Sequence, residues 1–401
     1  MRLSTIDSIL IRALYLTAAG IFVMQTLGED TLVSLLFAMT FLLVAAFWFT
    51  GAIRQITWCD GVTLFAIVLA LMNVILNAKI TGTALSFGYL KKFIMFSFTL
   101  LFFQTAYKAE PDEKTVRFLG LVNSFLAVYL IYFYYTEPMY THWMNNRVAD
   151  YVTFRFTNPN LVALFLICLF MGELLQVLKP MKEKRSADYL RRGFHILLAC
   201  AMLKFIQETK SRNCILVAIL VIGCFAVLYL RKRNFRIAGW FSVLVALFPM
   251  IFLMIYISVI EMPFIQSMFS FMSSKGKELD TRLTVWLPAL ETYFASPILG
   301  SYSQISNSST LNQLHNSHLE ILASYGTVIL MLVSYLICRF VWTPNQAARK
   351  TETALRLCFS GIIFLGMGEA AIFSGGLGIY IYAGVFLLLM RPDQPSSGDA
   401  L

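Results

Sequence analysis

Long apolar runs, nearly free of charge, recur along the chain and are separated by shorter polar stretches. A run of about 18 or more apolar residues is long enough to cross a lipid bilayer as a helix. A segment inside the bilayer must satisfy its own backbone hydrogen bonds, which favours helices over open sheets. The pattern therefore predicts an all-α polytopic integral membrane protein, with a single membrane domain over residues 1–401.

About twelve segments of the chain fit this description. The weakest are 88–107, which contains Lys91 and Lys92, and 193–209, which contains Lys204. The predicted spans are 9–27, 31–50, 60–78, 88–107, 116–136, 159–178, 193–209, 213–230, 237–260, 317–341, 355–373 and 376–391.

The lysine and arginine residues give these spans a direction. If the N-terminus is cytoplasmic, the cytoplasmic side carries about twice as many of them as the opposite side, as the positive-inside rule requires. Both termini are then cytoplasmic. Two long loops fall on the opposite side: residues 137–158, and residues 261–316, where apolar and charged positions alternate at a spacing typical of short amphipathic helices. The tail 392–401 is polar and is predicted to be disordered.

Composition supports the membrane assignment and narrows the function. The chain is 58% hydrophobic and 13% charged, and its mean hydropathy is +0.71. The net charge of +10 is explained by basic cytoplasmic loops, so it does not indicate nucleic-acid binding. The seven cysteines lie mostly in apolar runs without CxxC or Cys/His clusters. Because nucleotide-binding and metal-ligand motifs are also missing, we expect no metal and no cofactor.

Arginines on the non-cytoplasmic side are the first candidates for chemistry. Arg155, Arg212 and Arg282 lie outside the basic loops, and Arg212 sits in a turn of a few residues between two spans. Guanidinium groups bind phosphate with two parallel hydrogen bonds and keep their charge, so these residues could hold a lipid diphosphate. The alternative is that each arginine contacts lipid headgroups or pairs with a nearby acid such as Asp280.

Two of the four histidines lie in the sequence LNQLHNSHLEILASYG, residues 311–326. A helix that starts near Asn316 places His315 at its edge and Glu320 about one turn inside. A neutral imidazole at the mouth of a polar loop can act as a general base. The alternative is that His315 and Asn316 cap the helix, since asparagine is a strong N-cap residue. His318 is expected to serve packing or a local hydrogen bond.

Glu173 and Glu369 fall within or near predicted spans. Such residues are expensive in a bilayer and face an interior or a partner, for which Lys204 is one possibility. A proton relay and a structural hydrogen bond are both open.

Together these motifs resemble those of the O-antigen ligase family, within the group that also holds the O-antigen polymerases. The resemblance covers most of the chain. The family pattern of His-Asn, nine residues and a glycine fits His315 to Gly326, followed by Ile329 where the family prefers Gly, Thr or Val. The other matching stretches are Thr209-Lys210-Ser211-Arg212, Asp280-Thr281-Arg282 with Trp286, Ser296 to Gly300, and Phe156 to Asn160.

The resemblance implies a membrane glycosyltransferase of GT-C type in the bacterial inner membrane, active in lipopolysaccharide biosynthesis. It would transfer a glycan from undecaprenyl diphosphate to a sugar hydroxyl of lipid A–core at the periplasmic face, without metal or ATP and with inversion. The implied catalytic residues are His315, Arg212 and Arg282. The implied substrate-binding residues are Arg155, Asn316, Asn160, Lys210, Trp286 and Glu320.

Two other functions remain open at this point. An O-antigen polymerase performs the same chemistry with a growing glycan as acceptor; the single dominant loop favours a ligase, while the 137–158 loop keeps a polymerase possible. A transporter is the alternative from another class. Transporters often show internal repeats with broken helices at matching positions, and no such symmetry is evident in the sequence.

Overall fold

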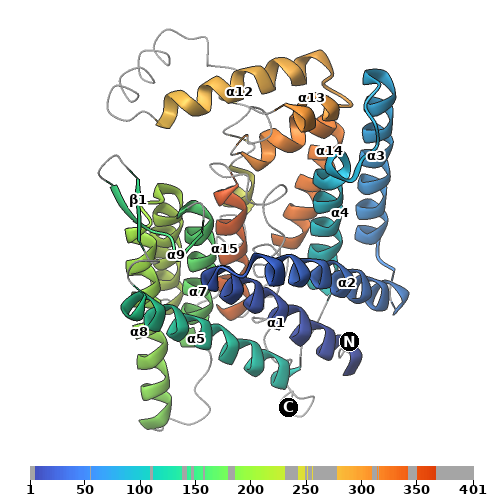
Figure 1. The fold of residues 1–401 in the computed structure, drawn as a ribbon. Coiled ribbons are helices and arrows are strands. Elements are labelled where there is room, and N and C mark those ends of the chain that lie inside the picture. Colours follow the sequence, from blue (N-terminus) through green and yellow to red (C-terminus); the bar gives the residue numbers. More distant parts are fainter. Residues whose placement is uncertain are drawn as a thin grey trace.

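Long helices make up nearly all of the computed structural model (Figure 1). It describes residues 5–54, 56–108, 112–137, 142–145, 149–156, 159–178, 186–230, 243–248, 251, 255, 278–308, 314, 316–341 and 350–366. Within these ranges the exception to helical structure is a two-stranded hairpin. The predicted class, a largely helical membrane protein, is confirmed at this level.

Six of the described helices are long and apolar enough to cross a membrane. They are α1 (Thr5–Leu27), α2 (Asp30–Arg54), α3 (Trp58–Thr81), α5 (Glu113–Thr136), α7 (Pro159–Leu178) and α14 (Ser317–Val341). Shorter apolar stretches lie in α9 (Arg212–Leu230) and α15 (Lys350–Leu365). The predicted spans with lysines are the helices α4 (Phe87–Lys108) and α8 (Ser186–Glu208). The predicted span 376–391, the tail 392–401 and most of 237–260 lie outside the described residues, so twelve spans remain a prediction.

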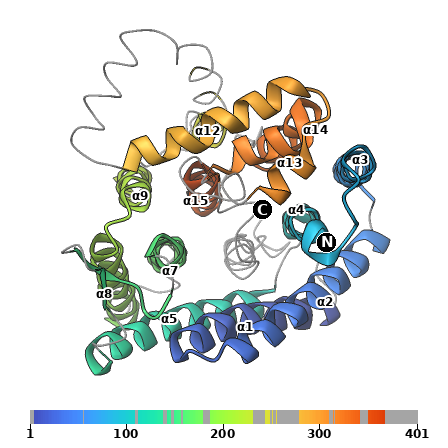
Figure 2. The ribbon, with the colours of Figure 1, turned by 45° about the horizontal axis from the view of Figure 1, so that its top comes forward.

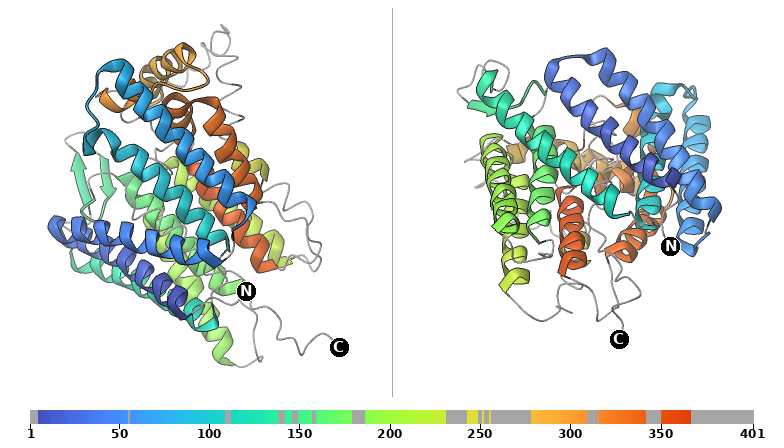
Figure 3. Two further views of the ribbon diagram at one scale, coloured as in Figure 1. Left: turned by 90° about the vertical axis from the view of Figure 1, so that its right-hand side faces the viewer. Right: turned by 90° about the horizontal axis from the view of Figure 1, so that it is seen from below.

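Helices α1, α2 and α5 form a layer that crosses α7, α8 and α9 obliquely (Figures 1 and 3). The starts of α1 and α5 are tied together by Arg12, whose Nε donates to Thr115 Oγ1 at 3.0 Å and whose Nη2 lies 3.7 Å from Asp112. Asp112 also caps α5, because its carboxylate accepts from the Thr115 backbone N–H. On the other side of the bundle, α3, α4 and α14 run side by side (Figure 3, left).

The segment 137–158, expected as a loop, contains a short antiparallel hairpin of β1 (His142–Asn145) and β2 (Ala149–Val152). The chain then turns through Phe154 and Arg155, both of which have positive φ angles. The Arg155 Nη1 donates to the Leu27 carbonyl at 2.5 Å, and Gly28 leaves room for the guanidinium, 3.2 Å from where a Cβ would stand. Arg155 therefore closes the C-terminal end of α1.

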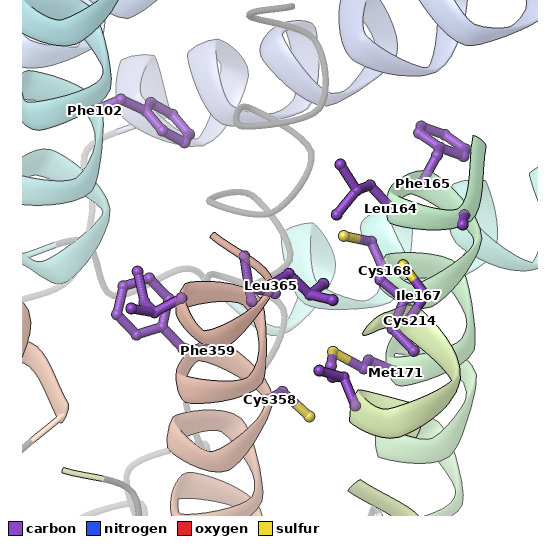
Figure 4. Close-up of a cluster of buried hydrophobic side chains, with 14 of the residues drawn as sticks. Phe102, Leu164, Phe165, Ile167, Cys168, Met171, Cys214, Cys358, Phe359 and Leu365 are labelled. Atoms are coloured by element: carbon purple, nitrogen blue, oxygen red, sulfur yellow. The ribbon is translucent and has the colours of Figure 1, made fainter. Parts of the chain in front are cut away.

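An apolar core fills the space between α7, α9 and α15 (Figure 4). Side chains such as Ile167, Cys168 and Met171 on α7 face Cys214 on α9 and Cys358 on α15, and all of them are buried. Gly361 allows the close approach of α15, since a Cβ there would lie 3.0 Å from a methyl group of α9. Most of α7 is buried on every side, which explains why its sequence is apolar all round.

One polar network interrupts this core. The Glu173 carboxylate, fully buried on α7, accepts from Asn123 Nδ2 at 2.7 Å and from Ser124 Oγ at 2.9 Å, both on α5. Its other oxygen lies 2.6 Å from His195 Nδ1 on α8. The structure therefore pairs Glu173 with His195, whereas Lys204 lies 3.7 Å from Glu208 on its own helix. Four hydrogen-bonding groups from three helices meet at this point, as a buried charge requires. Glu369 lies outside the described residues.

We expect replacement of Gly172 by alanine to lower the free energy of unfolding by about 1–3 kcal/mol. The added Cβ would lie 2.7 Å from the Asn123 amide atoms and would displace a donor from the buried Glu173. The midpoint of thermal unfolding in detergent measures this effect. Gly223→Ala is the matched control, because nothing lies within 4 Å of a Cβ there. Equal midpoints for the two variants would contradict the prediction.

The remaining helices cover one end of the bundle. Helix α12 (Glu278–Ala295) lies across this end and packs on α14 (Figures 1 and 2). The short α13 (Tyr302–Asn307) follows and contacts α3, α4 and α14. Helices therefore occupy most of the described part of the 261–316 segment, and they position the region where α14 begins.

Candidate functional site

Helix α14 begins at the position that the sequence indicated, and Asn316 is its N-cap. The Asn316 Oδ1 accepts from the backbone N–H groups of His318 and Leu319, at 3.1 and 2.9 Å. These two groups have no partner within the helix, so the side chain stabilises the first turn. The capping alternative is therefore correct for Asn316. His315 lies outside the described residues, but the peptide bond places it directly before this cap.

Ten residues after the cap, α14 is interrupted at Gly326, whose φ of 82° and ψ of 177° are non-helical. In an unbroken helix the Thr327 N–H would donate to the Ala323 carbonyl. Here the Thr327 N–H donates to the Pro297 carbonyl at 2.9 Å, and the Ala323 carbonyl accepts from the Ser301 N–H at 2.8 Å. The N–H and the carbonyl that would pair with each other in an unbroken helix are thus both hydrogen-bonded to the chain between α12 and α13.

Two glycines make this exchange possible. A Cβ on Gly326 would lie 2.0 Å from the Ile298 carbonyl oxygen, and a Cβ on Gly300 would lie 2.6 Å from the backbone of residues 324–326. Gly300 also has a positive φ, of 70°. Backbone atoms cannot swing aside as a flexible side chain can, so both positions require glycine. The Ser296–Gly300 turn and the His315–Gly326 stretch, separate motifs in the sequence, are therefore in direct contact.

Gly326→Ala and Gly300→Ala should each lower the free energy of unfolding by more than about 2 kcal/mol, since each combines backbone strain with a clash against backbone. Thermal unfolding and size-exclusion elution in detergent measure the effect. The helical Gly193→Ala serves as the control, because the space around its Cβ is open. Alanine variants at 326 and 300 as stable as the control would show that the contact is dispensable.

Tyr302 anchors the same chain segment to α4. Its hydroxyl donates to the Tyr89 carbonyl at 2.6 Å and accepts from the Phe93 N–H at 3.2 Å. These two backbone groups are four residues apart on α4, and the hydroxyl bridges them. Ser303 Oγ lies 2.7 Å from the Tyr89 hydroxyl. Burial raises the pKa of the Tyr302 hydroxyl, which therefore remains a proton donor throughout the physiological range.

An ion pair lies between these two anchoring points. Lys92 Nζ on α4 is 2.9 Å from Glu320 Oε1 on α14, and the exposed fractions of the two side chains are 15% and 5%. Stacking of Phe96 against Tyr325, with ring centroids 4.7 Å apart, joins the same helices one turn further on. Glu320 is therefore a buried carboxylate with a fixed cation, close to the start of α14.

Trp286 connects α12 to this region. It is buried, and its indole N–H donates to the Leu314 carbonyl at 2.7 Å. Leu314 and Asn316 are the two neighbours of His315 in the chain. The backbone is thus held at Leu314 by Trp286 and at Asn316 by the cap. A role of Trp286 in substrate binding stays a prediction.

The other predicted site residues lie around α7, α8, α9 and α12. Arg155 binds the end of α1. Lys210, with a φ of 56°, forms the exposed turn between α8 and α9, and Arg212 is the exposed first residue of α9. Asn160 is half-buried in the first turn of α7. The backbone of Arg282 belongs to the first turns of α12, and its side chain is outside the described part.

The structure thus brings Trp286, Asn316 and Glu320 into one region, together with Lys92 and Tyr302. Sequence reasoning did not assign a site role to the last two. The adjacent Lys91 and Lys92 in an otherwise apolar run were a signal, because a lysine within a span normally has a partner. Tyr302 has no comparable signal in the sequence.

No group of three or more His, Cys, Asp or Glu side chains that could hold a metal ion occurs among the described residues. No family model matches the chain, and no curated protein matches it. The resemblance to the O-antigen ligases therefore rests on the motifs themselves.

Proposed function

We propose that the protein is a membrane glycosyltransferase of the O-antigen ligase type. It transfers a glycan from undecaprenyl diphosphate to a sugar hydroxyl of lipid A–core at the periplasmic face of the inner membrane, with both termini in the cytoplasm. The observation that carries the proposal is the contact between the 296–300 turn and α14 at Gly300 and Gly326. Two stretches that resemble family motifs, about 20 residues apart in the chain, form one backbone-to-backbone unit at the break in α14, the helix that begins after Asn316.

The reaction uses the residues as follows. The acceptor oxygen attacks the anomeric carbon, the bond from that carbon to the diphosphate oxygen breaks, and the acceptor proton passes to His315. Undecaprenyl diphosphate leaves with the bonding electron pair. Arg212 and Arg282 bind this diphosphate and stabilise the charge that develops on it. Attack from the face opposite the leaving group inverts the anomeric centre. The donor is already activated, so the reaction needs neither ATP nor a metal ion.

Purified protein in detergent should transfer glycan from the lipid-linked donor to lipid A–core without ATP or added metal. His315→Ala should lower kcat by at least about 100-fold, the usual contribution of a general base. Arg212→Ala and Arg282→Ala should lower kcat/KM strongly, because the leaving group loses a cation. Arg117→Ala is the control: this arginine is exposed and pairs only locally with Glu113. Full activity of the histidine and arginine variants would refute the mechanism.

Trp286→Phe should lower kcat by about 10-fold with little change in KM, because misplacing a catalytic group by a fraction of an ångström slows the reaction. The phenyl ring keeps most of the apolar contact and loses the 2.7 Å bond to the Leu314 carbonyl. The matched control is Trp58→Phe, at an exposed tryptophan. If both tryptophan variants turn over like the wild type, the bond has no role in catalysis.

Polymerase activity is the second candidate. The observation that favours it is the folded hairpin in the 137–158 segment, because this second structured region could hold a growing glycan. The two functions differ in their acceptor. A ligase transfers polymer to lipid A–core, whereas a polymerase lengthens the lipid-linked glycan when no lipid A–core is present. Product analysis with each acceptor alone distinguishes them. A transporter would yield no transfer product in either assay.

A further inference from the structure

A groove runs between α3, α4, α14 and α15, along the last turns of α14. It encloses about 470 Å³, part of which is open to the surroundings. Its walls are mainly apolar and include Leu100 and Phe103 on α4, Leu336 and Phe340 on α14, and Phe359 on α15. Ligand pockets commonly have volumes of this order, so the groove has room for part of a hydrocarbon chain.

The walls of the groove are held in place by ring contacts and by one arginine. The buried Phe359 points away from the core between α7, α9 and α15 (Figure 4). Its ring centroid lies 5.5 Å from that of Phe103 and 4.4 Å from that of Phe340. Arg356 on α15 donates to the Phe340 and Val341 carbonyls at 3.3 and 3.0 Å, and this ties α15 to the end of α14. The groove is therefore a fixed feature of the packing.

Most polar groups around the groove already have partners at the start of α3. Gln104 Nε2 donates to Thr57 Oγ1 and Asp60 Oδ1, both at 3.3 Å. The Asp60 carboxylate also accepts from the Thr57 backbone N–H at 2.6 Å. The Thr63 hydroxyl donates to the Cys59 carbonyl at 2.8 Å. These groups are engaged within the protein, so they do not require a polar ligand in the groove.

Arg339 is the charged residue among those that line the groove. It is exposed and lies in the last turn of α14. No acidic side chain of the described residues forms an ion pair with it, whereas the exposed Arg117 pairs with Glu113. A guanidinium group matches the geometry of a phosphate and keeps its charge. The end of the groove at Arg339 is therefore complementary to a phosphate.

We propose that this groove binds an anionic phospholipid, with an acyl chain between the helices and the phosphate on Arg339. An empty apolar groove would lose the dispersion contacts that close packing supplies, and lipid tails are the apolar material at hand in a bilayer. Basic pockets between membrane helices bind anionic headgroups in the same way. The lipid would join α4, α14 and α15 at the end that the proposed topology makes cytoplasmic.

This site is separate from the one proposed for glycan transfer. None of Trp286, Asn316 and Glu320 lines the groove. The inference therefore does not depend on the transfer reaction, and it can be tested in the purified protein without a glycan donor.

Native mass spectrometry of the detergent-purified protein tests the role of the headgroup. The probes are phosphatidylglycerol and phosphatidylcholine with the same acyl chains. We expect one phosphatidylglycerol to bind more tightly than phosphatidylcholine. Arg339→Gln should weaken phosphatidylglycerol binding by about fivefold or more, because one charge-assisted contact is lost. The matched control is Arg117→Gln, which removes an arginine that lies outside the groove.

Cys59 reports on the chain inside the groove, because its thiol is buried, free and part of the wall. Its rate of reaction with N-ethylmaleimide is followed by peptide mass spectrometry. Phosphatidylglycerol at about ten times its Kd should slow labelling by about 10-fold, since only the unoccupied fraction reacts. Labelling of the exposed Cys200 on α8 should not change.

A second pair of variants changes the groove without changing its charge. Leu336→Trp places a larger side chain in the wall, so it should weaken binding and remove the effect of lipid on Cys59. Met331→Trp is the control, because this exposed residue of α14 does not line the groove. Thermal unfolding verifies that each variant folds. If Leu336→Trp does not fold, Arg339→Gln at its exposed position supplies the test.

Tighter binding of phosphatidylglycerol, its loss in Arg339→Gln and protection of Cys59 support the inference. Equal binding of the two lipids, or unchanged binding in Arg339→Gln, would show that the arginine recognises no headgroup. Labelling of Cys59 that does not respond to bound phosphatidylglycerol would show that the acyl chain lies elsewhere. Equal protection by detergent alone would mean that any alkyl chain fills the groove. Each of these three results overturns the proposal.

Discussion

The exchange of backbone hydrogen bonds at Gly326 is the interaction on which the arrangement of the site depends. In an unbroken α14 the Thr327 N–H would donate to the Ala323 carbonyl. Here the Thr327 N–H donates to the Pro297 carbonyl, and the Ala323 carbonyl accepts from the Ser301 N–H. Inside a membrane protein, non-helical backbone is tolerated where protein buries it and satisfies its polar groups. The turn between α12 and α13 meets that condition, and it is thereby held at a defined place on α14. Trp286 on α12 and Tyr302 on α13 lie on the two helices that this turn joins.

Buried charges are the second constraint. Among the buried carboxylates of the described bundle, Glu173 lies beside His195 and Glu320 lies beside Lys92. The two sites differ in how fully they are satisfied. Both Glu173 oxygens have partners, so its network is complete and its role in packing is clear. Glu320 keeps one oxygen unpaired beside the segment that holds His315. Complete hydrogen bonding of its carboxylate gives Glu173 a structural role, whereas the unpaired oxygen of Glu320 marks a candidate site.

Several features could be predicted from particular residues. Asn316 before an apolar run predicted the start of α14, and the structure places the helix there. The alternation in the 261–316 segment indicated helices, of which α12 and α13 are found. Partners at long separation could not be predicted. The sequence suggested Lys204 as a partner for Glu173, whereas the structure pairs Glu173 with His195. The contact of Arg155 with the end of α1 had no signal in the sequence. Hydrophobic patterns record which face of a helix is buried, not which residue lies opposite.

The sequence by itself determined the class of the protein and the order of its elements, because bilayer thickness and the need to satisfy every backbone group leave a long apolar run few alternatives. It also placed Arg155, Arg212 and Arg282 outside the basic loops, and Gly300 and Gly326 in short stretches that resemble family motifs. Only the tertiary structure decided that Gly300 meets Gly326, that Lys92 rather than Lys91 carries a partner, and that Trp286 binds the chain next to His315. Such contacts join residues tens to hundreds of positions apart. They follow from the packing of whole helices, a property that no local pattern contains.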